Sequence, residues 1–139
     1  MSIQFKSYLF AIIAGAIYYY LVLIFWGYFP SFNPFFNWLL DCCAASAWFR
    51  PIVLFQDVVI NVLLAIPLAW LLLRLNSERI WWCVLLALLP GFIYMHYHLF
   101  SWNHSLVDYT KFVPGWAMEL LSLPVAVFLV RVCHRRQMA

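Results

Sequence analysis

Long apolar stretches alternate with short polar ones along the chain. An α-helix rises about 1.5 Å per residue, so crossing a hydrocarbon core about 30 Å thick takes about 20 apolar residues. Four stretches have that length, namely 8–29, 52–73, 80–100 and 115–133. The pattern therefore predicts an all-α integral membrane protein, with four transmembrane helices forming a single domain over residues 1–139.

The second and third stretches are separated only by the polar residues Asn76, Ser77, Glu78 and Arg79. Short connections usually join helices that are neighbours in a bundle. We therefore expect these two spans to form an antiparallel hairpin, packed side by side.

The segment 30–51, between the first two spans, is rich in aromatic residues. Asn33 and Pro34 form a typical helix start, and Pro51 is expected to end a helix begun there. We interpret the segment as an interfacial helix on the outer side of the membrane, either a simple anchor or a lid or partner-docking surface. The residues expected to contact a partner are Phe35, Phe36, Trp38, Trp48 and Phe49.

Composition supports the membrane assignment, since 68% of the 139 residues are hydrophobic and only 9% are charged. Soluble domains carry about 25% charged residues, so soluble, disordered and nucleic-acid-binding classes are excluded. Basic residues near span ends stay in the cytoplasm. Six of the eight basic residues lie on one side, which predicts cytoplasmic termini and a bacterial inner (plasma) membrane location. The residues expected to contact anionic lipid headgroups are Arg131, Arg135 and Arg136.

Two further features concern small and sulfur-containing side chains. Ala11 and Gly15 form a small-xxx-small pair that would let another helix approach the first span closely. Cys42 and Cys43 are adjacent and belong to no Cys-x-x-Cys motif, so we expect buried, unreactive thiols.

Polar residues inside the predicted spans are the main candidates for function, because ionisable groups are costly in a bilayer. Asp57 lies five residues, or roughly 8 Å, inside the outer end of its span, with Asn61 one turn further along the same face. His96 and Glu119 lie about 6 Å inside the third and fourth spans. If these faces meet, the four residues form one intramembrane polar cluster. The secondary candidates nearby are Gln56, His98, His104 and Asp108.

Such a cluster has three interpretations, which we rank in the order given. It forms hydrogen bonds that fix the register of the helices, it pairs with another membrane subunit, or it performs transport or catalysis. His96 and His98 point to nearly opposite sides of a helix, which argues against a shared metal ion. We expect no metal and no cofactor.

The chain contains no catalytic or nucleotide-binding motif, so an enzyme is the less favoured class. Our leading hypothesis is an accessory or scaffolding subunit of an inner-membrane complex. Its partners would be membrane lipids and another membrane protein or further copies of itself, with no nucleic acid. The alternative is an oligomeric proton or cation channel or carrier using Asp57 and Glu119. A third possibility is an intramembrane lipid-handling enzyme using His96 and Glu119.

Overall fold

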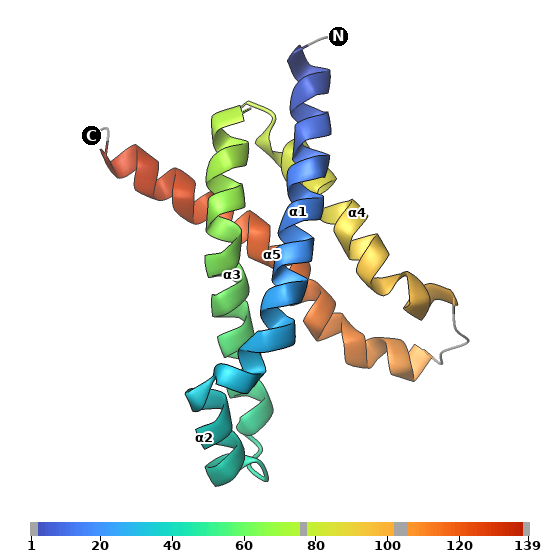
Figure 1. Ribbon diagram of the computed structural model, residues 1–139, viewed down its shortest axis with the longest axis vertical. Coiled ribbons are helices and arrows are strands. Elements are labelled where there is room, and N and C mark those ends of the chain that lie inside the picture. The colour runs from blue at the N-terminus through green and yellow to red at the C-terminus, as the bar shows by residue number, and fades with distance from the viewer. Residues whose placement is uncertain (1–2, 76–77, 102–105, 138–139) are drawn as a thin grey trace.

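The computed structural model describes residues 3–75, 78–101 and 106–137 (Figure 1). Within these ranges the chain is helical and contains no strand, which confirms the predicted all-α class. The helices are α1 (Ile3–Phe32), α2 (Pro34–Cys43), α3 (Phe49–Leu75), α4 (Ile80–Ser101) and α5 (Leu106–Gln137).

Four of these helices are long and apolar enough to cross a membrane, as predicted for an integral membrane protein. Their apolar segments are Gln4–Phe29, Phe49–Leu75, Ile80–Tyr97 and Val113–His134. The long helices continue beyond the predicted apolar spans. The largest difference is at α5, which begins at Leu106 and passes through Asp108 and Lys111 before the apolar segment starts.

The long helices pack as two pairs, α1 with α4 and α3 with α5, and the contacts between these pairs are much less extensive. Figure 1 shows that the members of each pair run in the same direction, with α5 crossing α3 obliquely. The predicted hairpin of α3 and α4 is therefore wrong, because these two helices diverge from their connecting turn and make few contacts. A short turn fixes only two helix ends, whereas side-chain shape decides which faces pack.

Packing is concentrated toward the α3–α4 turn, in a region that we call the closed half. It comprises residues 7–19 of α1, 62–72 of α3, 80–91 of α4 and 122–127 of α5. The fully buried large side chains here include Leu72, Ile80, Leu123 and Val127. We call the rest of the four long helices, toward α2 and the α4–α5 connection, the open half.

Small residues allow α1 and α4 to approach closely. Ser7, Ala11, Gly15 and Tyr19 are buried at four-residue intervals along one face of α1. A Cβ atom at position 15 would overlap the backbone of Ala87 in α4. Tyr19 in turn lies against Gly91, where an added Cβ would overlap the tyrosine ring. The small-residue pair noted in the sequence therefore lies at a helix–helix contact, with α4 as its partner.

Helix α2 begins as predicted but ends differently. The Asn33 side chain accepts hydrogen bonds from the backbone N–H groups of Phe35 and Phe36, at 3.1 and 3.2 Å, and Pro34 takes the first helical position. The helix ends at Cys43, and Pro51 lies in the first turn of α3. The prediction that Pro51 ends the α2 helix is wrong, because proline in the first turn of a helix needs no N–H partner.

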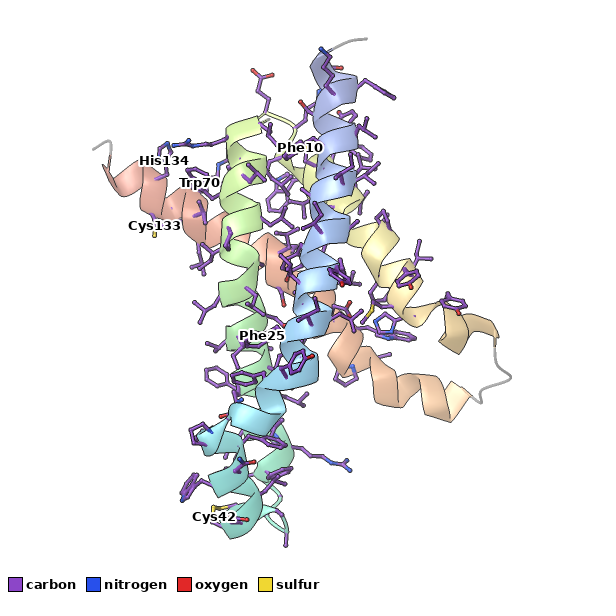
Figure 2. The ribbon with its side chains drawn as sticks, viewed as in Figure 1. Phe10, Phe25, Cys42, Trp70, Cys133 and His134 are labelled. Atoms are coloured by element: carbon purple, nitrogen blue, oxygen red, sulfur yellow. A yellow bond between two sulfur atoms is a disulfide. The ribbon has the colours of Figure 1, made fainter. Side chains whose placement is uncertain are left out.

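Exposed tryptophans occur at both ends of the bundle, as in proteins whose aromatic rings lie at the two membrane interfaces. Trp38 and Trp48 are exposed near α2, and Trp70, Trp81 and Trp82 are exposed near the α3–α4 turn. Figure 2 shows Trp70 and Cys42 at opposite ends of the molecule. The guanidinium of Arg74 stacks on the Trp70 ring, 3.9 Å from its centroid.

Candidate functional site: a polar cavity between the helix pairs

The open half contains a cavity of about 870 Å³ bounded by α1, α3, α4 and α5. All four residues of the predicted polar cluster, Asp57, Asn61, His96 and Glu119, line this cavity. The two helix pairs diverge here, so the four side chains face a common space between the pairs. The cavity reaches Ser122 of α5, beyond which buried apolar side chains fill the bundle.

His96 and Glu119 form a direct contact between α4 and α5. The imidazole Nε2 lies 2.8 Å from the carboxylate Oε2, a hydrogen bond that becomes an ion pair when the imidazole is protonated. The rings of Phe92 and Trp116 hold the imidazole in place, with centroids 4.7 and 5.7 Å from its own. Since α4 and α5 belong to different pairs, this contact joins the two pairs at their open end.

A second hydrogen bond joins the pairs through α1 and α3. The indole Nε1 of Trp26 donates to the side-chain oxygen of Asn61 at 2.9 Å. Trp26 was not among the residues predicted from the sequence. The available signal was its indole N–H, a donor that needs a partner when the ring lies inside a membrane span.

Asp57 differs from the other three cluster residues. Within the described part of the chain its carboxylate makes no hydrogen bond and no ion pair, although the side chain is half-buried. Arg50, about two turns before Asp57 on α3, also lines the cavity and has no ionic partner among the described residues. Asp57 and the exposed Arg50 therefore both line the cavity without an ionic partner among the described protein groups.

Two more polar groups lie near the cluster without good hydrogen bonds. The buried hydroxyl of Tyr19 is within electrostatic reach of Glu119, but its geometry does not form a hydrogen bond. The side-chain oxygen of Gln56, a secondary candidate, is also buried without a partner among the described groups. Gln56 does not line the cavity. The side chains of the other secondary candidates, His98, His104 and Asp108, lie outside the described residues.

The other predicted sites lie at the two ends of the bundle. Arg131 is exposed near the end of α5, where Figure 2 shows Cys133 and His134. The side chains of Arg135 and Arg136 lie outside the described residues. Arg79, at the α3–α4 turn, donates to the side chain of Gln4 at 3.4 Å, and a hydrogen bond with Tyr8 raises the pKa of its guanidinium.

The aromatic residues around α2 divide into two groups. Phe36 and Phe49 are half-buried and face each other, with ring centroids 6.4 Å apart. Phe35, Trp38 and Trp48 are exposed. Three of the five predicted contact residues are thus exposed, and we call these three the α2 surface.

Cys42 and Cys43 form a disulfide between adjacent residues at the end of α2 (Figure 2). The expectation of buried, unreactive thiols is therefore wrong, and Cys42 is exposed. That expectation followed from the rarity of bridges between adjacent cysteines, and the structure has both residues in the last turn of α2. Cys83 and Cys133 are free thiols.

The chain matches no protein-family model, and no curated protein or solved structure is significantly similar to it. Among the described residues, no group of three or more histidine, cysteine, aspartate or glutamate side chains is arranged to hold a metal ion. The site is therefore defined by two hydrogen bonds that join the helix pairs and by Asp57 and Arg50, which have no ionic partner among the described residues.

Proposed function

We propose that this protein is an accessory subunit of a membrane protein complex that binds its partner through the α2 surface. The observation that carries this proposal is the exposure of three large aromatic side chains outside the membrane-spanning segments, two on α2 and one in the turn that follows it. Phe35, Trp38 and Trp48 are 45%, 58% and 72% exposed. Exposed apolar patches rimmed by polar groups mark interaction sites, and tryptophan is enriched among the residues that dominate binding energy.

The α2 helix is built to present this surface. Leu39 is buried against the bundle, and the Phe36–Phe49 contact holds the helix to the start of α3. The cap at Asn33 fixes where the helix begins. The exposed rings are therefore held by a structured element, which reduces the entropy lost when a partner binds.

We propose that both termini lie on the cytoplasmic side of a bacterial inner membrane. Arg74, Arg79 and Arg131 all lie toward the end that carries the termini and the α3–α4 turn, whereas Arg50 lies at the opposite end. Basic residues near span ends favour the cytoplasmic side. The α2 surface would then face the periplasmic side, where a disulfide persists.

Native mass spectrometry of the protein, extracted gently from its own membrane, tests the proposal. We expect a defined complex with a second membrane protein at fixed stoichiometry. Replacing both Trp38 and Trp48 by alanine should release that partner. Replacing Trp81 and Trp82, which are exposed at the other end, is the matched control and should leave the complex intact.

Two results would overturn the proposal. The first is that the protein extracted from its native membrane is a monomer or forms only homo-oligomers. The second is equal loss of the partner in the two double variants, since tryptophans at either end would then act only as membrane anchors.

A second candidate, an oligomeric proton or cation channel or carrier, is favoured by one observation: Asp57 lines a cavity and has no ionic partner among the described residues. Because apolar side chains fill the closed half, transport would require a second conformation or a pathway between copies. Equal flux in liposomes for the natural protein and Asp57→Asn would remove this candidate.

A further inference from the structure

The polar cavity lies beside an apolar groove between α1 and α3. The groove has a volume of about 470 Å³ and is lined by residues such as Phe10, Ile17, Leu64 and Leu71. Tyr18 and Val22, one turn apart on α1, line both spaces. A ligand that enters the cavity between these helices would therefore meet polar groups on one side and an apolar groove on the other.

The length of the groove suits a lipid chain. It follows α1 from Phe10 to Val22, twelve residues, or about 18 Å along the helix axis. On α3 the groove begins at Leu64, seven residues or about 10 Å deeper than Asp57, so an acyl chain about 15 Å long whose headgroup lies at Asp57 reaches into it.

The charges of the cavity suit a headgroup that carries both signs. Arg50 and Asp57 lie seven residues apart on α3, so they share one face and are about 10 Å apart along the axis. The long Arg50 side chain covers part of this separation. A headgroup with its phosphate at the guanidinium and its ammonium at the Asp57 carboxylate would span the rest. Neither residue has an ionic partner among the described groups.

Aromatic rings also line the cavity. Tyr18, Tyr19, Trp26 and Trp116 all line the same cavity. Aromatic faces attract cations, and sets of such rings bind ammonium groups in many proteins. The buried Tyr19 hydroxyl, which lacks a hydrogen bond of good geometry, adds a polar group for a ligand to satisfy.

We propose that the cavity and the groove together bind one zwitterionic membrane phospholipid. Its ammonium lies beside Asp57, its phosphate is held by Arg50, and one acyl chain passes Tyr18 and Val22 into the groove. Both interactions are charge-assisted, which makes them stronger than neutral hydrogen bonds. This site is separate from the α2 surface, so it does not depend on the accessory role.

Lipid titration followed by native mass spectrometry in mild detergent tests the site. The probes are phosphatidylethanolamine, phosphatidylcholine and phosphatidylglycerol with identical acyl chains. We expect one high-affinity lipid per chain for the two zwitterionic lipids. Phosphatidylglycerol, which lacks the ammonium, should bind at least about tenfold more weakly, the loss expected for one charge-assisted contact.

Variants separate the two parts of the site. Asp57→Asn should remove the preference for zwitterionic headgroups, while Asp41→Asn, an exposed carboxylate on α2, is the matched control and should change nothing. Arg50→Gln should weaken all three lipids, and Arg74→Gln, at the other end, should not. Val22→Trp should weaken binding by filling the passage to the groove without altering any charge.

Several outcomes would overturn the proposal. Phosphatidylglycerol that binds as tightly as the other lipids would do so, as would an unchanged headgroup preference in Asp57→Asn. Equal effects of Asp57→Asn and Asp41→Asn would show adventitious binding of lipid to the surface. Circular dichroism of each variant in the same detergent establishes that it is folded. Should Asp57→Asn fail to fold, unaltered binding by Val22→Trp would by itself reject the site.

Discussion

The closed and open halves of the bundle are built from the same four helices but are held together by different forces. In the closed half, small residues let α1 and α4 approach until the backbones touch, and leucine, valine and isoleucine side chains are buried around that contact. In the open half, the pairs diverge, and the hydrogen bonds from His96 to Glu119 and from Trp26 to Asn61 join them across a cavity.

This difference shows how a small membrane protein can combine stability with a polar site. Lipid provides no hydrophobic drive for helix association, so close packing and hydrogen bonds must provide it. The closed half supplies the packing. The open half can then hold charged groups at a distance from one another, while the hydrogen bonds from His96 to Glu119 and from Trp26 to Asn61 join the pairs.

The largest effect is expected from removing packing in the closed half. Leu123→Ala leaves a cavity at a fully buried position of α5 and should lower the free energy of unfolding by about 2–5 kcal/mol. The matched control is Leu121→Ala, on the same helix but 58% exposed, which should cost less than about 0.5 kcal/mol. Unfolding in mixed micelles, followed by circular dichroism, measures both. Equal costs would mean that the closed half is not the packed core.

The close approach of α1 and α4 predicts the next effect. Gly15→Ala forces a methyl group into the backbone of Ala87 and should destabilise by about 1–3 kcal/mol. Gly27→Ala, in the open half of the same helix, has no atom within 4 Å of the added group and should be neutral or slightly stabilising. The same unfolding assay compares the two, and a Gly15→Ala protein as stable as the natural one would contradict this helix pairing.

In the open half, each hydrogen bond between the pairs should contribute a smaller amount. A double-mutant cycle with His96→Leu and Glu119→Gln should give a coupling energy of about 0.6–1.7 kcal/mol, the range known for such bonds in membranes. A cycle with Trp26→Phe and Asn61→Leu should give a similar value. A cycle that combines His96→Leu with Trp26→Phe serves as the control and should be additive, since the two bonds share no residue. A coupling energy near zero between the two residues of a hydrogen bond would show that this bond does not hold the helix pairs together.

The smallest effect on stability is expected at Asp57. Because its carboxylate makes no hydrogen bond or ion pair with the described residues, Asp57→Asn should change the free energy of unfolding by less than about 0.5 kcal/mol. The measurement is made in lipid-free detergent, so that bound lipid does not contribute. A loss comparable to that of Glu119→Gln would assign Asp57 a structural role.

Much of the fold could be predicted because it depends on local features. The length of apolar runs located the four long helices, and the Asn33–Pro34 pair located the start of α2. Depth along each span also placed Asp57, Asn61, His96 and Glu119 at one level, which is where the structure has them around one cavity.

The features that could not be predicted depend on contacts between distant parts of the chain. The partner of α4 is decided by Gly15, Ala87 and Gly91, whose fit is visible only once both helices are in place. The division of the aromatic residues around α2 depends on the Phe36–Phe49 contact in the same way. Trp26 was missed because its role requires Asn61, 35 residues away.

The pairing of α1 with α4 and of α3 with α5 has a consequence for how the chain is made. Neither pair consists of neighbours in the sequence, so α1 enters the membrane well before its partner has been synthesised. At about 5–20 residues per second, the 48 positions from the end of α1 to the start of α4 take several seconds to translate. Until α4 has been synthesised, the small residues Ser7, Ala11 and Gly15 on α1 do not have the helix against which they pack in the folded protein.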